Sequence, residues 1–284
     1  MREGRKLQVK FLKLKEQLNN LGSAVVAYSG GVDSSLLTRV AFDCLGKNSV
    51  AVTAKSITYS PQELKEAKDF TKSIGIKHLV INTDEFKNHK FVNNQKDRCF
   101  YCKQELFSRL KNIAAGLGIK YILDGTNKDD VKDIRPGKKA AKQFNVISPL
   151  EDAGLGKKEI RALCQEFGIN YQKPQGACLA SRIPFGEKIT RQNILKVRKA
   201  EELLRNYFDD NILFRARHHN SILRIEIGNK DWTKLKKSDI NSLVSKLKKV
   251  GYKYITLDLE GYVPAGLRQI KQQIFRPKRR RKFA

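Results

Sequence analysis

A glycine-rich loop between an apolar run and a helical pattern restricts the fold of this chain more than any other feature. Residues 25–37 read VVAYSGGVDSSLL. The apolar run ends at Tyr28, and apolar residues at helical spacing resume at Leu36 and Leu37. The sequence therefore predicts a strand, a short polar loop and a helix in direct succession, which is the unit from which parallel sheets are built.

The polar loop has the composition of an anion-binding site. Its two glycines let the backbone curl so that N–H groups point into one concavity, and the following helix offers its positive end to the same place. Serine hydroxyls beside the glycines add further donors. The lysine of the G-x-x-x-x-G-K-[ST] loop is absent, so this is another kind of phosphate loop. We expect nucleotide phosphates to bind at Ser29, Gly30, Gly31, Asp33 and Ser34.

Short apolar runs alternate with helical patterns over the first two-thirds of the chain. The apolar runs lie at 24–28, 50–54, 78–82, 121–124 and 145–148. One helix start is explicit, because Ser60 precedes Pro61 and stands three residues before Glu63, and Gly75 ends the pattern. Strands that alternate with helices predict an α/β fold with a parallel sheet covered on both faces.

The pattern changes after a Pro-Phe-Gly sequence that ends at residue 186. The elements predicted beyond it are a long helix at 191–208, a half-exposed strand at 221–227, a helix at 233–250 and a strand at 253–258. We therefore expect a nucleotide-binding domain over residues 1–186 and a smaller α+β domain over residues 187–284.

The charge of the chain bears on its partners. The 57 Lys and Arg residues outnumber the 29 Asp and Glu residues, and the net charge is +28. Such a field attracts polyanions and anionic small molecules, or it serves solubility alone. A basic run at 275–282 is typical of a tail that contacts nucleic acid, which stays open as a partner. No apolar run approaches the ~20 residues of a membrane span, and the N-terminal residues lack a signal-peptide pattern, so we expect a cytoplasmic protein without a membrane partner.

The chain has five cysteines, and an odd number in a protein expected to be cytoplasmic favours thiol or metal chemistry over disulfides. Cys99 and Cys102 form a C-x-x-C pair at the predicted start of a helix, and Cys178 supplies a third thiol. Together they are candidate ligands of a metal or an iron–sulfur cluster, while structural zinc and a chance pair remain alternatives. Arg182 is close in sequence to Cys178 and is expected to lower the pKa of its thiol.

The loop motif resembles that of the PP-loop ATP pyrophosphatases, enzymes that cut ATP to AMP and pyrophosphate. In that superfamily S-G-G-x-D-S follows the first strand, as it does at residues 29–34, which are termed the PP-loop here. The resemblance implies that a substrate oxygen attacks the α-phosphate and that pyrophosphate leaves with Mg²⁺. ATP and Mg²⁺ are therefore expected.

Further blocks resemble the LarE family of ATP-dependent sulfur transferases. They keep the family's order over nearly the whole chain and lie at 29–34, 98–103, 124–130, 133–137, 176–184 and 215–219. The resemblance adds Gly125 and Thr126 to the nucleotide site. It also places a substrate phosphate at Arg215 and Arg217, which would share one face of a strand; a solvated basic strand is the alternative.

The same resemblance implies the reaction. Family members adenylate a carboxylate of a pyridinium biscarboxylate mononucleotide and insert sulfur, a step in making a nickel-pincer cofactor. The sulfur comes either from the cysteine that matches Cys178 or, in three-cysteine members, by way of a [4Fe–4S] cluster, and Cys99, Cys102 and Cys178 favour the second type. Sulfur must come within ~3–3.5 Å of the activated carbon, so segment 176–182 should fold back over the carboxyl edge of the sheet. Members are often oligomers, so a homo-oligomer is expected too.

Three other functions remain open. A PP-loop tRNA thiolation enzyme also combines three cysteines with a cluster and predicts salt-dependent binding of tRNA. An amidating PP-loop ligase needs no cysteine, so Cys178→Ala would leave it active. An RNA-binding protein with an inactive nucleotide loop would release no pyrophosphate.

Overall fold

The computed structural model describes residues 2–132, 136–172, 176–208, 212–228, 231 and 237–262. The chain divides into two compact units, Met1–Arg198 and Lys199–Ala284. The domain boundary that the sequence indicates at residue 186 stays a prediction. The basic run at 275–282 lies outside the described residues.

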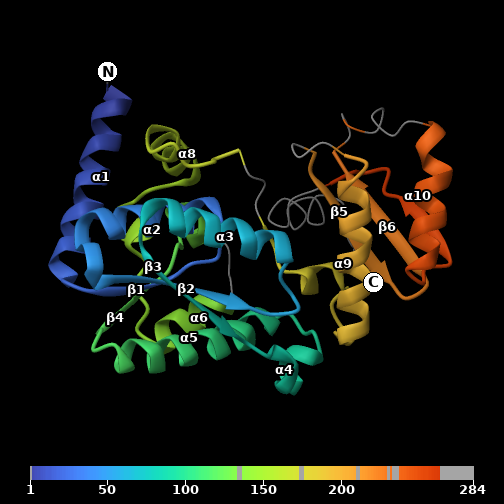
Figure 1. Cartoon of the computed structure of the whole chain (residues 1–284), viewed down its shortest axis with the longest axis horizontal. Helices are drawn as coiled ribbons and strands as arrows, with labels where there is room; N and C mark the ends of the chain where they lie inside the picture. The colour runs from blue at the N-terminus through green and yellow to red at the C-terminus, as the bar shows by residue number, and fades with distance from the viewer. Residues whose placement is uncertain are drawn as a thin grey trace, which may run out of the picture. The chain divides into compact units, whose positions relative to one another are not determined.

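The described part of the first unit contains a sheet of four parallel strands in the order β3-β2-β1-β4 (Figure 1). The strands are β1 (Ala24–Ala27), β2 (Ser49–Lys55), β3 (Lys77–Asn82) and β4 (Tyr121–Leu123). In this register Val26 of β1 stands opposite both Ala51 and Leu123. The chain first adds β2 and β3 on one side of β1 and then crosses over to add β4 on the other side, so the direction of strand addition reverses between β1 and β4. Ligands of such sheets bind at the carboxyl ends of the strands, at the point of this reversal.

The prediction of a full strand at 145–148 is wrong. Only Ile147 bridges to the sheet, beside Leu123 of β4. Asn145 has a left-handed φ of 52°, and Pro149 begins the next helix, so the extended stretch between them is too short for a ladder. The segment nevertheless extends the edge of the sheet beyond β4.

Helices cover both faces of this sheet (Figure 1). Helices α1, α2, α3, α7 and α8 pack on one face and helices α5 and α6 on the other, with α4 preceding α5. Their bounds are α1 (Arg2–Leu21), α2 (Val32–Leu45), α3 (Pro61–Ile74), α4 (His89–Val92), α5 (Arg98–Gly116), α6 (Pro136–Gln143), α7 (Pro149–Asp152) and α8 (Lys157–Glu166). The predicted α/β class with a sheet covered on both faces is confirmed.

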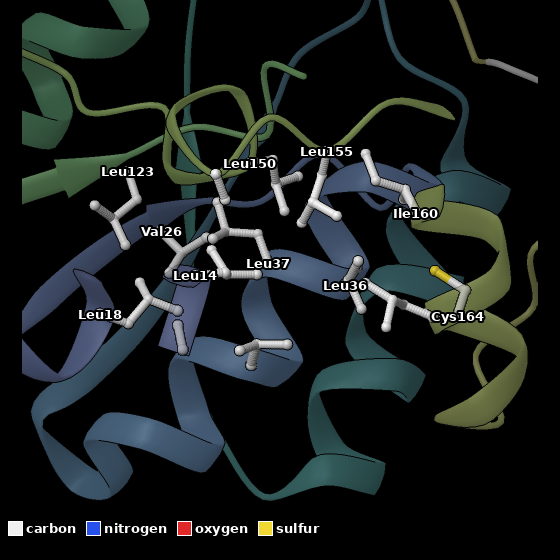
Figure 2. Packing of buried hydrophobic residues seen from close by; sticks show 14 of the residues in the cluster. Leu14, Leu18, Val26, Leu36, Leu37, Leu123, Leu150, Leu155, Ile160 and Cys164 are labelled. Carbon is white, nitrogen blue, oxygen red and sulfur yellow. The ribbon is translucent and has the colours of Figure 1, made fainter. Parts of the chain in front are cut away.

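The alternation of side chains along β1 explains why this strand is buried on both faces. Val26 points into the core on the α1–α2 side, whereas Val25 packs with Phe107 and Leu110 of α5. Figure 2 shows the first of these cores, with the labelled side chains Leu14, Leu18, Val26, Leu36, Leu37, Leu123, Leu150, Leu155, Ile160 and Cys164. Burial on both faces fixes β1, and with it the start of the PP-loop, in the middle of the fold.

Helix α3 begins and ends as its sequence predicts. The Ser60 hydroxyl oxygen accepts the N–H of Gln62 at 3.2 Å, and Oε2 of Glu63 accepts the N–H of Ser60 at 3.2 Å. Pro61 occupies the first turn, and Gly75 closes the helix in the left-handed region at φ 80°. These caps hold the first turn of α3 at the carboxyl end of β2.

The second unit is a small α+β structure. Its described strands are β5 (Phe214–His219), β6 (Ile222–Ile227) and β7 (Tyr254–Leu257), in the order β5-β6-β7. β5 and β6 are antiparallel, β6 and β7 are parallel, and the core lies under the last part of α9 (Arg191–Arg205) and under α10 (Lys237–Lys249). Helix α9 begins in the first unit and ends in the second. No described helix combines the length and apolarity that crossing a bilayer requires.

Candidate active site

The PP-loop curls at the carboxyl end of β1. Gly30 adopts a left-handed φ of 74°, which turns the chain back toward α2. The hydroxyl oxygens of Ser29 and Ser34 lie 3.0 Å apart across the turn. Gly31 is the N-cap residue of α2 and has no side chain to occupy the N–H groups of the first helical turn. The loop thus leaves a helix N-terminus for an anion, beside the Ser29 hydroxyl and the Ser34 hydroxyl, which donates to the carbonyl of Gly31 at 3.0 Å.

The loop after β4 closes against the PP-loop. A Cβ atom on Gly125 would lie 3.0 Å from the backbone nitrogen of Ser34, so only glycine lets the two segments approach this closely. Thr126 is held by Asp124, whose carboxylate accepts the N–H of Thr126 at 3.1 Å and its hydroxyl at 2.9 Å. The structure therefore brings Gly125 against the PP-loop at the reversal of strand order.

Carboxylates gather beside the first turn of α2. The Asn127 side chain donates to Oδ2 of Asp33 at 2.9 Å. Burial raises the pKa of Asp33; the Asn127 hydrogen bond lowers it, and the charge of Asp130 raises it. Asp129 instead accepts the N–H of Lys157 at 2.7 Å and so holds the start of α8. Asp33 and Asp130 are thus the candidate oxygen ligands for a cation at this place, and Asp130 also forms an ion pair with Lys157 at 3.7 Å.

A largely apolar hollow lies next to the PP-loop. Its lining includes Ser29 of the loop, Thr53 of β2, Leu106 of α5, and Tyr59 and Glu63 at the start of α3. Apolar walls with a few polar groups beside a phosphate loop suit a nucleotide. Sequence reasoning did not single out Tyr59, because its position follows from the path of the chain between β2 and α3.

The structure brings the three candidate thiols together. Cys99 is exposed, whereas Cys102 and Cys178 are half-buried and pack against one apolar cluster. Burial, followed by the charges of Cys178, Glu85 and Cys99, raises the pKa of Cys102 well above its usual value. The pKa of Tyr59 is likewise raised, by the charge of Cys102, by burial and by the charge of Cys178. Within the described ranges, however, no three His, Cys, Asp or Glu side chains are arranged to hold a single metal ion.

The expectation that Arg182 makes the Cys178 thiol acidic is wrong in its net direction. Burial raises the pKa of Cys178, and the charge of Cys99 adds to this; Arg98 and Arg182 lower it by less. The Arg182 guanidinium donates to the carbonyl of Ala177 at 2.8 Å and to that of Cys178 at 3.2 Å. The Arg182 guanidinium therefore mainly holds the backbone around Cys178 in place.

Contacts that are remote in sequence fix the Cys178 segment. Cys178 is the N-cap residue of the 3-10 turn Leu179–Arg182, and the N–H of Leu179 donates to the carbonyl of Thr58 at 2.8 Å. The buried Asn94 side chain donates to the carbonyls of Pro184 at 2.6 Å and Glu187 at 2.8 Å. Asn94 was missed from the sequence, although it is one of the residue types that tolerate its left-handed φ of 53°.

The first turns of α3 contact both the PP-loop and the chain before Cys178. A Cβ atom on Gly30 would lie 3.4 Å from Cβ of Ala67 and 3.6 Å from the carbonyl oxygen of Glu63. A Cβ atom on Gly176 would lie 3.0 Å from Oε1 of Glu63. Glu63 thus lies between the segment that suits phosphates and the segment that carries the thiol.

The candidate phosphate ligands of the second unit lie on one strand. Arg215 and Arg217 are both in β5, and Arg217 forms an ion pair with the buried Glu226 at 2.9 Å. The guanidinium of Arg215 donates to the carbonyl of Phe214 at 2.8 Å and lies 5.1 Å from the centre of the Tyr262 ring. A shared phosphate site at the two arginines stays a prediction.

Comparisons with known proteins agree with these features. The family profile described as NAD synthase matches residues 6–117. The chain is 38% identical to an uncharacterised protein of Synechocystis sp., over 93% of this chain and 98% of that protein. It is 35% identical to the pyridinium-3,5-bisthiocarboxylic acid mononucleotide synthase of Lactiplantibacillus plantarum, over 90% of this chain and 92% of that enzyme. An uncharacterised protein of Methanocaldococcus jannaschii is 32% identical over 88% of this chain and 94% of its own length.

The match to the Lactiplantibacillus enzyme covers both units, whereas the NAD synthase profile covers only the PP-loop part of the first. The family assignment rests on 35% identity to this synthase over 90% of the chain, together with a PP-loop that precedes a cysteine-bearing segment. The chain belongs to the LarE family of ATP-dependent sulfur transferases.

Proposed function

We propose that this protein adenylates a carboxylate of a pyridinium biscarboxylate mononucleotide and replaces the adenylate with sulfur. The name of the Lactiplantibacillus relative supports the substrate class. The observation that carries the proposal is the position of Glu63, which lies next to Gly30 of the PP-loop and next to Gly176 before Cys178. A nucleotide held by the loop and a sulfur carried near residue 178 would therefore meet over the start of α3.

The first step activates the carboxylate. A carboxylate oxygen attacks the α-phosphorus of ATP, the bond to the β-phosphate oxygen breaks, and pyrophosphate leaves with Mg²⁺. The first-turn N–H groups of α2 and the hydroxyls of Ser29 and Ser34 would bind the phosphates, and Asp33 and Asp130 would face the cation. The product is an acyl adenylate, in which AMP replaces oxide as the leaving group.

The second step transfers sulfur. A sulfur nucleophile attacks the acyl carbon, the bond from that carbon to the AMP oxygen breaks, and AMP leaves with the oxygen. If Cys178 is the donor, the intermediate is a thioester; loss of the Cα proton and cleavage of the Cβ–S bond then leave a thiocarboxylate product and dehydroalanine at position 178. Efficient transfer requires the sulfur nucleophile to be held ~3–3.5 Å from the acyl carbon.

We favour the other sulfur source, a [4Fe–4S] cluster held by Cys99, Cys102 and Cys178. Burial and the charges of Cys178 and Cys99 raise the pKa of Cys102, and Cys102 and Cys178 share an apolar wall. Three thiols this close to one another suit three corners of a cluster, which is wider than a single ion. When bound, the cluster would supply an exchangeable sulfide, and position 178 would survive turnover. The apolar wall around Cys102 and Cys178 would limit the access of solvent and oxygen.

Anaerobic purification followed by one turnover separates the two sources. A brown protein with about four irons, whose Cys178 keeps its mass after thiocarboxylate forms, is expected for the cluster. A colourless protein whose Cys178 peptide loses H₂S would instead establish the sacrificial route. Cys99→Ser should abolish transfer only in the cluster case, and Cys44→Ser is the matched control because Cys44 packs in a different apolar cluster from Cys102 and Cys178.

The substrate class has a separate test. Pyrophosphate release from ATP should depend on the pyridinium biscarboxylate mononucleotide and should be unaffected by added tRNA. The net charge of +28 suits tRNA, so release that depends on tRNA, with binding that weakens steeply as salt rises, would overturn the assignment. The homo-oligomer and the cytoplasmic location stay predictions.

A further inference from the structure

The turn between β2 and α3, residues 56–59, contacts both halves of the candidate site. The carbonyl of Thr58 accepts the N–H of Leu179 at 2.8 Å, next to Cys178 in the chain. The following residue, Tyr59, lines the hollow that also includes Ser29 of the PP-loop. A change in the path of this turn would therefore move the thiol segment relative to the nucleotide.

A buried carboxylate holds this turn from one side. Glu85 is 3% exposed, and its two oxygens accept the hydroxyls of Ser56 at 2.6 Å and Thr83 at 2.9 Å. The Ser56 hydroxyl oxygen in turn accepts the N–H of Thr58 at 3.1 Å. These hydrogen bonds of hydroxyl groups hold the start of the 56–59 turn, and none of them involves the carbonyl groups of residues 57–59.

Arg198 holds the same turn from the other side. This half-buried residue of α9 donates from one guanidinium nitrogen to the carbonyl of Ile57 at 2.5 Å and to that of Tyr59 at 3.3 Å. The two carbonyls flank that of Thr58, the acceptor for the thiol segment. Hydrogen bonds from a charged donor are roughly twice as strong as neutral ones, so this clamp adds to the backbone hydrogen bond from the N–H of Tyr59 to the carbonyl of Ser56 at 3.2 Å in orienting the turn.

We infer that Arg198 is a positioning residue for sulfur delivery: it orients the 56–59 turn so that the Thr58 carbonyl holds the Cys178 segment over the nucleotide. The inference rests on the proposed function and adds a residue to it. Arg198 contacts neither the PP-loop nor a thiol through the hydrogen bonds described, so its effect falls on the transfer step. A lysine would keep a positively charged donor on a flexible stem and would restore part of the clamp.

The test compares Arg198→Ala and Arg198→Lys with Arg191→Ala in the full-length protein. Arg191 lies on the same helix, pairs with Asp84 at 2.7 Å and is 56% exposed, which makes it the matched control. With ATP and the mononucleotide saturating, Arg198→Ala should lower the rate of thiocarboxylate formation ~10–100-fold, as a misplacement of about 1 Å does. Formation of the acyl adenylate, followed by substrate-dependent exchange of labelled pyrophosphate into ATP, should stay within ~3-fold of the wild type. Arg198→Lys should lie between the two, and Arg191→Ala should match the wild type.

A second readout does not need the reaction. The rate at which iodoacetamide alkylates Cys178 in the metal-free protein, followed by peptide mass, should change at least ~3-fold in Arg198→Ala and Arg198→Lys but not in Arg191→Ala, because a loosened segment exposes the thiol differently. Equal alkylation and equal transfer rates in all variants, or a parallel fall in exchange and transfer, would overturn the inference. A wild-type protein that makes no thiocarboxylate would refute the proposed function instead, and the alkylation result would still decide the role of Arg198 in holding the segment.

Discussion

Replacing Gly125 with alanine should push the PP-loop out of place. The added Cβ would lie 3.0 Å from the nitrogen and 3.1 Å from Cα of Ser34, both backbone atoms, whereas ordinary contacts are ~3.5–4 Å. One segment must therefore move by roughly 0.5 Å, and overpacking of this kind costs about 1–3 kcal/mol. In a unit of this size that cost lowers the Tm by about 2–4 °C per kcal/mol.

Nucleotide binding should weaken by the same free energy. If the loop shifts to relieve the clash, ATP must restore it, and the same 1–3 kcal/mol corresponds to a ~5–160-fold rise in the Kd for ATP. Calorimetric titration with MgATP and a thermal melt measure the two effects. Gly116→Ala is the control, because nothing lies within 4 Å of its added Cβ; it should be neutral or stabilising by about 0.5–1 kcal/mol. An unchanged Kd and Tm in Gly125→Ala would refute the close approach.

Three further changes test the scaffold. Ser60→Ala removes the N-cap oxygen of α3 and should lower the free energy of unfolding in urea by about 1 kcal/mol; an unchanged midpoint would contradict the cap. Burial, followed by the charge of Lys68, lowers the pKa of His78, so the unfolded chain protonates first as the pH falls below about 6.5. The free energy of unfolding should therefore fall between pH 7 and pH 5, and it should fall less in His78→Gln. If chemical denaturation gave the same dependence on pH for the variant and the wild type, this contribution would be excluded. Glu226→Ala removes a fully buried carboxylate that pairs with Arg217 at 2.9 Å and with Arg224 at 3.4 Å, and it should lower the free energy of unfolding by about 3 kcal/mol; a loss under 1 kcal/mol would show that these pairs are not needed.

Local patterns accounted for the parts of the fold that depend on neighbours in sequence. The apolar run before Ser29 and the helical spacing after it predict β1 and α2, because both periodicities follow from local backbone geometry. The Ser60 cap and the Gly75 stop are likewise visible in a few letters. The incorrect prediction of a strand at 145–148 also came from a local pattern. Two apolar residues among four do not reveal that Asn145 turns the chain.

The candidate site depends on contacts that no local pattern contains. Asn94 holds a carbonyl 90 residues away, and Arg198 one 141 residues away, so only the folded chain shows their partners. The direction of the Cys178 pKa was mispredicted for a related reason. A nearby arginine is visible in the sequence, but the burial that outweighs it is a property of the packed segment.

The unequal exposure of the three thiols sets the order in which air would damage them. Cys99 faces solvent, while Cys102 and Cys178 stand against the apolar wall with raised pKa values and are mostly protonated at neutral pH. Oxidants reach exposed sulfur first, so in the metal-free protein the Cys99 sulfur should become a sulfenic acid before those of Cys102 and Cys178 react. For the cluster route that we propose, protein handled aerobically would then fail to load iron even though Cys178 is chemically intact.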